Sequence, residues 1–393
     1  MDFRFTEEQI KFRQEVRDFL AVTPLERFPC QIRDEGYGFG GWSFEFSREL
    51  AKKGWLGIPW PKEYGGLGMP LMNMFVVKDE LAYHGAPTMA HFFNDSMGLS
   101  FLVHGHEEQK KSFLPRMARG EIFFCTGLSE PNAGCDLLGL QMKARPLGDD
   151  FILSGQKIWT TGAFLADWAL MAAQTDPQAP RHKRISTFLV DLKSPGCAVR
   201  PLVDMTGNQS LSEIFFDEVK VPRSNLLGPL HAGFQLVLES LEGDRFWGRC
   251  VRASGTRRNL EKMIAYCRET THRGIALAED SLIRHQLANL AVEIEVCRAL
   301  TYRCISLLDK GVTLTHEASV LKTFADELGQ RAARLWMQIL GPAGQLWKDN
   351  KGLTIHEQVA HEYLFAPALT IAGGTSEIQR NTIALRGLGL PRE

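Results

Sequence analysis

The sequence predicts an α+β protein in which an N-terminal helical domain precedes a middle antiparallel β domain and a C-terminal four-helix bundle. Proline usage is the first reason, because 15 of the 18 prolines lie at or before Pro229 and none lies between Pro229 and Pro342. A proline-free run of this length, with apolar residues at helical spacing, is typical of long packed helices. The second reason is a change of period near residue 122, after which short apolar runs alternate with turn residues, as strands do. We therefore expect domains at residues 1–120, 121–229 and 230–393.

The first third of the chain has helical patterns. Thr6 and Gln9 form a capping-box pair, because each side chain can accept a hydrogen bond from the backbone N–H of the other residue. Apolar residues at positions 10, 12, 16 and 20 then give one apolar helix face. The Pro/Gly-rich stretch 55–68 is expected to be a connector. Further helices are predicted at residues 43–54, 73–83 and 106–118.

The remaining elements follow from the same patterns. Strands are predicted at residues 151–161, 168–175, 186–192 and 214–221. Because they follow one another without helices between them, antiparallel pairing in a domain of about 100 residues is favoured. Long helices are predicted at residues 231–269, 281–309 and 315–339, and a shorter one from Ser376.

Composition and charge exclude several classes of function. A formal net charge of −1 over 393 residues gives no electrostatic basis for binding nucleic acid or an anionic membrane. No apolar run reaches the roughly 18 residues that span a bilayer. The N-terminal residues resemble neither a signal nor a transit peptide, so a cytoplasmic location is expected. The eight cysteines are scattered without a C-x-x-C pair, which predicts free thiols in a reducing compartment.

Two apparent motifs are rejected as ligand sites. Residues 36–41 (GYGFGG) look like a dinucleotide-binding glycine loop, but no apolar strand precedes them, so a flexible turn is predicted. His356 and His361 flank a glutamate, as in a zinc motif. They lie five residues apart, whereas two ligands on one helical face need a spacing of four. No metal site is therefore predicted.

One loop is a candidate binding site. The segment 124–136 (FCTGLSEPNAGCD) turns sharply through Pro131, Asn132 and Gly134. Proline fixes φ, asparagine tolerates a positive φ and glycine adopts it freely, which together favour a tight turn with exposed backbone N–H groups. Such groups can bind an anion or the polar edge of a ring. Taken alone, the segment is more simply explained as an ordinary turn.

Five segments, in order along the chain, resemble motifs of the acyl-CoA dehydrogenase family. They are SEPNAGCD (129–136), GQKIWTTG (155–162), FFDEVKVP (215–222), QILG (338–341) and GTSEIQR (374–380). Each motif is modest alone, but the resemblance covers essentially the whole chain. It implies the same three-domain fold, FAD as cofactor, and α,β-dehydrogenation of an acyl-CoA with electrons passed to electron-transferring flavoprotein. It also implies a homotetramer, or a heterotetramer with a related subunit.

The resemblance implies a set of FAD contacts. Trp159 would pack against the flavin ring, and Gln338 and Gly341 would reach FAD across a subunit interface. Cys135 stands where the family usually has a serine that contacts cofactor or substrate. Because sulfur is a poorer hydrogen-bond partner, that contact is an open question. The implied contacts are Thr126, Leu128, Ser129, Gly134, Cys135, Trp159, Thr161, Gln338, Gly341, Thr375 and Glu377.

The expected catalytic base departs from a common family pattern. Where many members have a glutamate, this chain has Gly373, which has no side chain. Other members place the carboxylate on the first long helix of the C-terminal domain, just before an arginine, and the matching residues are Asp244 and Arg245. Asp244 is therefore the predicted base, and Gly243 would leave room for substrate to approach its short side chain. A base here needs a pKa raised by burial. Alternatively, Asp244 and Arg245 are solvated helix charges, or Asp95 is the base.

Substrate contacts are predicted at Arg245, Cys135 and Asp95 from the same resemblance. Bulky residues nearby in sequence either shape the acyl pocket or belong to the core. They are Phe92, Phe93, Phe246 and Trp247. A branched, cyclic or aromatic acyl group is suggested only by the relocated base.

A second departure lies after residue 266. Family members often have an arginine at the position of Thr270, where it contacts the FAD of a neighbouring subunit, and Arg273 is the candidate replacement. Two alternatives therefore stay open. In one, the chain binds flavin and acyl-CoA but catalyses a different reaction, such as a desulfinase-like elimination, and the Asp244 carboxylate argues against it. In the other, the chain is a half-site subunit of a hetero-oligomer.

Overall fold

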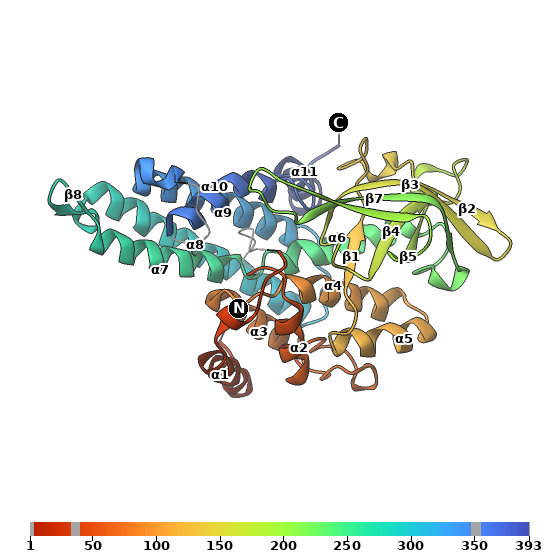
Figure 1. The fold of residues 1–393 in the computed structure, drawn as a ribbon, viewed down its shortest axis with the longest axis horizontal. Coiled ribbons are helices and arrows are strands. Elements are labelled where there is room, and N and C mark those ends of the chain that lie inside the picture. Colours follow the sequence, from red (N-terminus) through yellow and green to blue (C-terminus); the bar gives the residue numbers. More distant parts are fainter. Residues whose placement is uncertain (1–3, 33–39, 347–354, 393) are drawn as a thin grey trace.

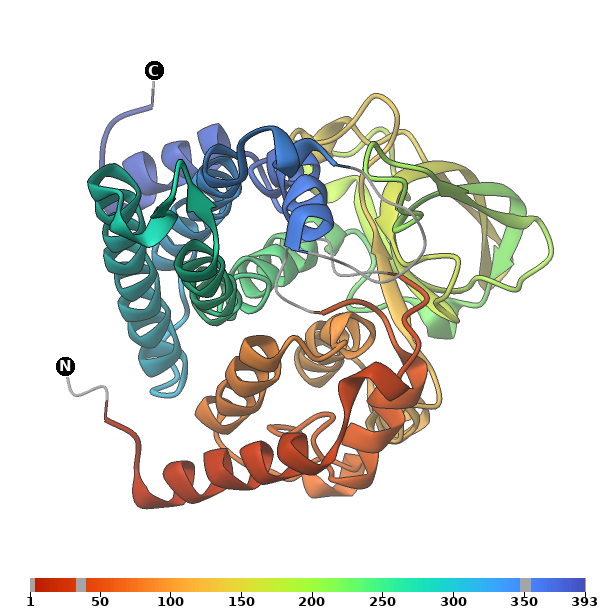
Figure 2. The ribbon, with the colours of Figure 1, turned by 60° about the vertical axis from the view of Figure 1, so that its left-hand side comes forward.

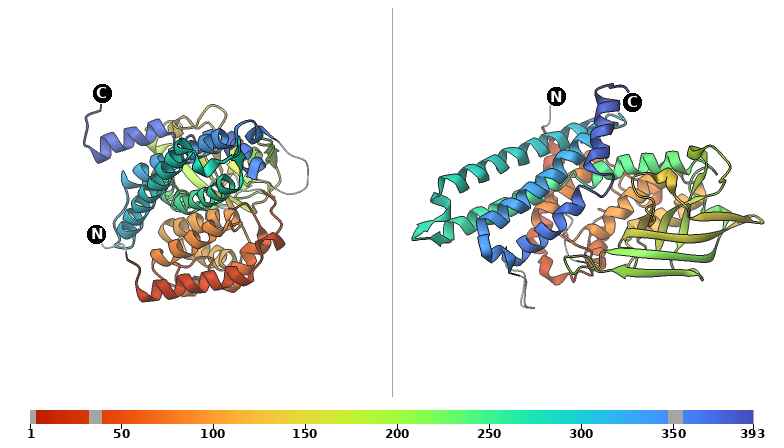
Figure 3. Two further views of the ribbon diagram at one scale, coloured as in Figure 1. Left: turned by 90° about the vertical axis from the view of Figure 1, so that its left-hand side faces the viewer. Right: turned by 90° about the horizontal axis from the view of Figure 1, so that it is seen from above.

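The computed structural model describes residues 4–32, 40–346 and 355–392. A helical domain, a β-sheet domain and a helical domain follow one another along the chain, as predicted (Figure 1). The long helices of the C-terminal domain run side by side at one end of the molecule, and the sheet lies at the other (Figure 3). Of the glycine-rich stretch 36–41, only Gly40 and Gly41 are among the described residues.

The N-terminal domain contains five α-helices. They are α1 (Glu7–Val22), α2 (Phe44–Lys52), α3 (Leu71–His84), α4 (Met89–His104) and α5 (Glu107–Ala118). Both hydrogen bonds of the capping box between Thr6 and Gln9 are present, which confirms the predicted start of α1. The sequence prediction missed α4. This helix is buried on most of its faces and has no side-chain cap at its N-terminus, so it lacks both the periodicity and the start signal of a surface helix.

The middle domain contains a seven-stranded sheet. Its strands are β1 (Phe124–Gly127), β2 (Lys143–Leu147), β3 (Asp150–Thr161), β4 (Trp168–Gln174), β5 (Ile185–Asp191), β6 (Cys197–Leu202) and β7 (Leu211–Val221). The pairs β2–β3, β3–β7, β4–β5 and β6–β7 are antiparallel, as predicted. The prediction of an antiparallel domain is wrong at β4, because both β1 and β2 pair with β4 in parallel. Strands β1, β2 and β6 were not predicted.

The C-terminal domain contains six α-helices among the described residues. They are α6 (Gly233–Trp247), α7 (Arg252–Glu269), α8 (Ser281–Leu308), α9 (Glu317–Leu340), α10 (Ile355–Leu369) and α11 (Ser376–Thr382). The single helix predicted at 231–269 is two helices, because a turn interrupts it between Trp247 and Arg252. Helix α10 was not predicted, and Pro367 within it obscures its pattern. Helices α7 to α10 are the four long members of the bundle.

A small hairpin follows α7 at the end of the bundle that lies far from the sheet (Figure 1). It pairs β8 (Thr271–His272) with β9 (Ile275–Ala276). Arg273 and Gly274 form the two-residue turn, and both have positive φ values, 52° and 79°. Positive φ at both positions is the requirement of a type I′ hairpin turn.

The three domains meet around α4, β1 and α6. Asn94 of α4 donates its amide to the carbonyl of Ile122 (2.7 Å) and accepts from the N–H of Phe124 (2.9 Å), which fixes α4 against the start of β1. Helix α6 packs against α4, α9 and β5. In Figure 2 the green α6 lies centrally, between the sheet, the N-terminal helices and the long helices of the bundle. This junction is where residues from all three domains come together.

Three further expectations concern the whole chain. All eight cysteines are described and all are free, which confirms the predicted free thiols. The described residues contain no cluster of histidine, cysteine, aspartate or glutamate side chains able to hold a metal ion. Within the described ranges, every helix is too short or too polar to cross a membrane.

Candidate active site

The loop after β1 is held in shape by a glutamate inside it. Backbone hydrogen bonds in both directions between Glu130 and Ala133 (2.8 and 3.1 Å) close the turn. The Glu130 carboxylate points inward and accepts from the N–H groups of Gln141 (2.6 Å) and Met142 (3.0 Å) and from the Lys157 ammonium (2.8 Å). A carboxylate with three donors is well satisfied despite its burial. The loop is therefore rigid at its base, while Cys135 at its outer end is exposed.

Lys157 joins this loop to β3. Its side chain is fully buried, and besides the ion pair its ammonium donates to the carbonyl of Leu128 (3.1 Å). Burial lowers the pKa of Lys157 to about 8, although the Glu130 carboxylate counteracts this. A backbone bond from Ile158 to the carbonyl of Ser129 (2.9 Å) adds a second link. The two sequence motifs at 129–136 and 155–162 are thus one structural unit.

Trp159 is presented to solvent by a strained backbone. The pairing of β3 with β7 is irregular between Lys157 and Thr160, and Trp159 lies in this irregularity with φ 61°. A bulky residue in the left-handed region is uncommon, and such strain is concentrated at functional sites. The Trp159 side chain is 59 % exposed. An exposed aromatic ring beside the loop at Leu128 and Ser129 suits stacking against a planar, polar-edged ring such as a flavin.

The predicted FAD contacts fall into two groups. Thr126, Leu128, Ser129, Trp159 and Thr161 come together, because β1 and β3 lie side by side and the links above tie them. Gly134 and Cys135 lie further out on the exposed part of the same loop. A Cβ added at Gly134 would meet no atom within 4 Å, so the surface there is open.

The C-terminal candidates are divided between two places. Thr375 caps α11 by accepting from the N–H of Ile378 (3.3 Å), and hydrogen bonding to its own backbone lowers the pKa of Glu377 in the first turn. Arg380 of α11 pairs with Glu327 of α9 (2.7 Å). Gln338 lies eleven residues further along α9, or about 16 Å at the helical rise. Gln338 and Gly341 are therefore remote from α11.

Asp244 lies on α6 at the domain junction. The hydroxyl of Ser96, from α4, donates a hydrogen bond to Oδ1 of Asp244. Burial raises the pKa of the Asp244 carboxyl, while the Ser96 bond and the charges of Arg249 and Arg245 act in the opposite direction. A carboxyl group with a raised pKa at a junction of domains has the properties expected of a general base. A Cβ added at the preceding residue, Gly243, would meet no atom within 4 Å, so the space at Gly243 is open.

The turn at Gly373 and Gly374 is held by donors from α6 and α11. Arg245 donates to the carbonyl of Gly373 (3.3 Å), Arg249 donates to the carbonyl of Ala372 (3.0 Å), and Gln379 donates to the carbonyls of both glycines (3.2 Å each). Arg249 also pairs with the buried Asp326 of α9 (3.1 Å). The carbonyls thus face the arginines. The N–H groups of Gly373 and Gly374 donate to no acceptor in the described part of the chain.

The predicted substrate contacts differ in their surroundings. Asp95 is only 4 % exposed and pairs with Lys78 of α3 (2.7 Å), so its carboxylate is occupied. Arg245 is buried and supports the Gly373 turn, whereas solvated helix charges were the alternative. Cys135 is exposed on the loop. Three of the four aromatic candidates belong to the core: Phe92, Phe246 and Trp247.

Several contributors were missed from the sequence. Ser96 and Arg249 were not singled out, and no role was assigned to Glu130, Lys157 or Gln379. The partners Ser96 and Asp244 are separated by 148 residues, so no local spacing connects them. Glu130 and Lys157 do lie inside the quoted motifs, and their opposite charges are a signal that could have suggested a pair.

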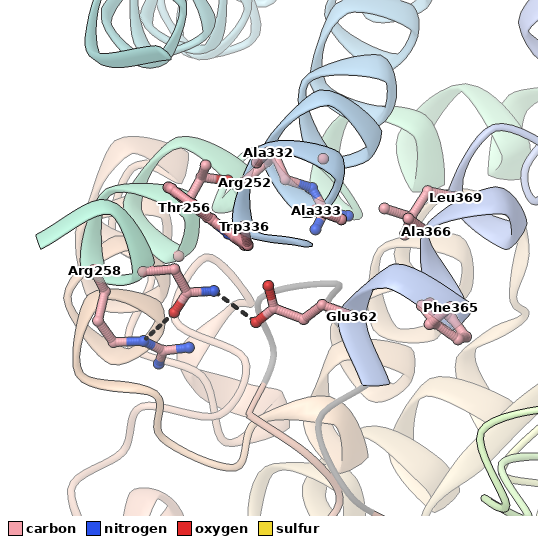
Figure 4. A pocket seen from close by; sticks show the side chains of 13 residues that line it. Arg252, Thr256, Arg258, Ala332, Ala333, Trp336, Glu362, Phe365, Ala366 and Leu369 are labelled. Atoms are coloured by element: carbon pink, nitrogen blue, oxygen red, sulfur yellow. Dashed lines mark hydrogen bonds between the residues drawn. The ribbon is translucent and has the colours of Figure 1, made fainter. Parts of the chain in front are cut away.

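A separate pocket lies in the bundle between α7, α9 and α10 (Figure 4). Arg258, Asn259 and Glu362 line one side through a chain of hydrogen bonds, of which Asn259 to Glu362 is the shorter (2.7 Å). Trp336 and Leu369 are among the apolar residues on the other sides. None of the predicted site residues lines this pocket.

A helical, β and helical domain order, with a carboxyl group of raised pKa where the domains meet, is the arrangement expected of a flavin-dependent oxidoreductase of the acyl-CoA dehydrogenase type. Three family models match: the acyl-CoA dehydrogenase N-terminal domain over residues 6–121, the middle domain over 125–219 and the C-terminal domain over 231–388. The chain belongs to the acyl-CoA dehydrogenase family, whose members are FAD-dependent oxidoreductases.

Individual relatives match over their full lengths. The acyl-CoA dehydrogenase FadE26 of Mycobacterium tuberculosis is 33 % identical, with 100 % of this chain and 99 % of the relative covered. A solved steroid ACAD, Tcur3481-Tcur3483, is 30 % identical with a TM-score of 0.88 and 100 % of both chains covered. The ChsE4-ChsE5 complex from M. tuberculosis is 31 % identical with a TM-score of 0.84, again over 100 % of both chains.

Proposed function

We propose that this protein catalyses the FAD-dependent α,β-dehydrogenation of an acyl-CoA thioester to the enoyl-CoA, with Asp244 removing the α-proton. The observation that carries the proposal is the Asp244 carboxyl itself. It lies on α6 where the three domains meet, it accepts a hydrogen bond from Ser96 of α4, and burial raises its pKa. The other family position for the base, Gly373, has no side chain.

Different residues of the chain have different roles in the proposed reaction. Asp244 accepts the α-proton on its carboxylate, which is the ionised form of the group. The N–H groups of Gly373 and Gly374 are candidates to bind the thioester carbonyl oxygen, because polarising that carbonyl makes the α-proton more acidic. When bound, FAD supplies the acceptor for the β-hydride. Trp159 and the loop that follows β1 hold the flavin, and the exposed outer loop at Cys135 contacts cofactor or substrate.

The assembly is a second part of the proposal. We infer a tetramer in which Gln338 and Gly341 of one subunit contact FAD bound to another, with electrons leaving to electron-transferring flavoprotein. A heterotetramer is favoured over a homotetramer by two observations. Thr270 replaces the arginine common in the family, and two of the similar solved structures are named for two components. Size-exclusion chromatography of the lone chain tests this, because a self-sufficient enzyme elutes as a homo-oligomer with stoichiometric FAD.

The hairpin residue Arg273 belongs to the same part of the proposal. It is exposed at a tip remote from the sheet of its own chain, so any FAD that it contacts is bound to another subunit. Its place on a tight turn next to Thr270 makes it the candidate replacement for the missing arginine.

The acyl group is proposed to be bulky and cyclic. The support is the steroid ACAD among the similar structures, together with the open space at Gly243 and the lack of a side chain at Gly373. A cytoplasmic location is also proposed, because eight free cysteines suit a reducing compartment.

The decisive experiment replaces the base. Asp244→Asn removes the acceptor for the proton but keeps the size of the side chain, so the rate of flavin reduction by acyl-CoA should fall by about 10²- to 10⁴-fold, the usual contribution of a general base. The flavin spectrum is followed after anaerobic mixing with straight-chain and steroid-type acyl-CoAs. FAD should stay bound.

The matched control is Glu242→Gln, two residues earlier on α6. Glu242 pairs with Arg386 (2.7 Å), and its loss should leave the rate unchanged. Normal flavin reduction by Asp244→Asn would refute the assignment of the base. An Asp244-dependent protein that eliminates a group without reducing its flavin would favour the desulfinase-like alternative.

A further inference from the structure

Three consecutive residues of α4 contact three different parts of the molecule. Asn94 bonds to the backbone at both Ile122 and Phe124, where the middle domain begins. Asp95 pairs with Lys78 of α3 inside the N-terminal domain (2.7 Å) and accepts from the backbone of Gly57. Ser96 donates to Asp244 of the C-terminal domain. Successive side chains on an α-helix point about 100° apart, so one turn of α4 can reach all three.

The contacts of Asn94 and Asp95 hold the Ser96 contact in a fixed position. Asn94 and Asp95 are both buried, and each has at least two polar partners. Breaking either would leave a buried polar group unsatisfied, which is costly. The rotation of α4 about its axis and its position along β1 are therefore fixed. The direction of the Ser96 hydroxyl toward α6 is set by these neighbours and not by Ser96 alone.

On the other side of the contact, the charged groups around Asp244 are mostly engaged elsewhere. On α6, Arg245 bonds to Gly373, and just after the end of α6, Arg249 bonds to Asp326. Two further charged residues on α6 are also paired: Glu242 with Arg386, and Glu239 with His104 of α4. The Asp244 carboxylate is contacted directly by the neutral Ser96 hydroxyl at Oδ1, and Oδ2 has no hydrogen bond in the described part of the chain.

We propose that Ser96 is a positioning residue for the catalytic base. By donating to Oδ1 it fixes the short Asp244 side chain in one orientation, presents Oδ2 to the substrate and stabilises the ionised carboxylate. This inference rests on the function proposed above. It explains how an aspartate can act at this position although it is one methylene shorter than glutamate, since its single free oxygen is held in place from a second domain.

The first test is Ser96→Ala, with flavin reduction followed against pH. A hydrogen bond to the ionised form lowers the pKa of a carboxyl group, so its removal raises that pKa. Because Asp244 acts when ionised, the acidic limb of the rate profile should move to higher pH by about one unit, the size of a typical charge-assisted bond. The dissociation constant for enoyl-CoA should not change. Ser96→Thr keeps the hydroxyl and should restore the profile.

The matched control is Ser100→Ala, one turn further along the same helix. The Ser100 hydroxyl donates only to the Ser96 backbone carbonyl (3.2 Å), so its loss removes the same atom from α4 without touching Asp244. The wild-type pH profile should be kept. A general loosening of α4 would instead lower the rate of both variants at every pH without moving the limb.

The second test does not depend on turnover. The Asp244 carboxyl is titrated by infrared difference spectroscopy, with Asp244→Asn as the blank, in the protein with and without Ser96→Ala. The protonated-acid band should persist to higher pH in Ser96→Ala. An unchanged band and an unchanged pH limb, with Asp244→Asn inactive, would overturn the role of Ser96 alone. Full activity of Asp244→Asn would overturn both proposals, because no base would remain to be positioned.

Discussion

Two positions in this fold can carry a catalytic carboxylate, and their surroundings differ sharply. At residue 244 the side chain leaves a regular helix and accepts a hydrogen bond from the neutral Ser96 hydroxyl. At residue 373 the backbone has φ 70°, and a Cβ would lie 3.3 Å from the Arg249 guanidinium, which is already bound to Asp326. A side chain at 373 would therefore require strain and the movement of a buried ion pair.

This difference indicates that the turn at Gly373 differs from a glutamate-bearing turn by more than one missing side chain. The backbone carbonyls of this turn already accept hydrogen bonds from arginine and glutamine side chains. The carboxylate proposed as the base is that of Asp244, on helix α6. A carboxylate moved from residue 244 to residue 373 is predicted not to support catalysis, because it would require backbone strain and the movement of the Arg249 ion pair. Each of the following variants tests the surroundings of one of these two positions.

The largest effect is expected when the carboxylate is moved to the turn. In the double variant Asp244→Asn/Gly373→Glu, the new glutamate should pair with Arg249 and not reach substrate productively. Flavin reduction should stay about 10²- to 10⁴-fold below the wild type, as in Asp244→Asn alone. Anaerobic stopped-flow reduction measures this. Recovery of the wild-type rate would show that position 373 is open after all.

An intermediate effect is expected from a single methyl group in the turn. Gly374→Ala places a Cβ at φ 90° and only 2.6 Å from the Gln379 amide, which binds both turn carbonyls. The free energy of unfolding should fall by about 1–3 kcal/mol, the range for a non-glycine residue in a strained backbone region. Urea denaturation measures the change. A neutral result would mean that the turn relaxes more easily than its contacts indicate.

The smallest effect, and one of opposite sign, is expected from the same methyl group on α6. Gly243→Ala adds a Cβ in open space within a helix. The free energy of unfolding should rise by up to about 1 kcal/mol, because alanine has the higher helix propensity. The thermal midpoint of the substrate-free protein is a suitable measure. Destabilisation here would contradict the open space at the position of Gly243.

Sequence reasoning succeeded where a pattern is local. The capping box at Thr6 and Gln9, the strand at 151–161 and the long helices after residue 281 are set by neighbouring residues, and the structure contains them. It failed for α4, which is buried on most faces and so shows no period, and for the break between α6 and α7. The short edge strand β1 pairs in parallel with β4, a long-range choice that its four residues do not encode.

The features of the candidate site show the same distinction between local patterns and long-range contacts. The sequence by itself identified the family and led to the proposed FAD contacts and to the proposal of Asp244 as the base, because motif order and the presence or absence of a carboxyl group can be read directly from the sequence. Only the tertiary structure decided that Ser96 reaches Asp244, that Lys157 supports the loop through Glu130, and that Arg249 closes the turn. These contacts join residues far apart in the chain, and their partners are chosen by the packing of domains against one another, which no local period records.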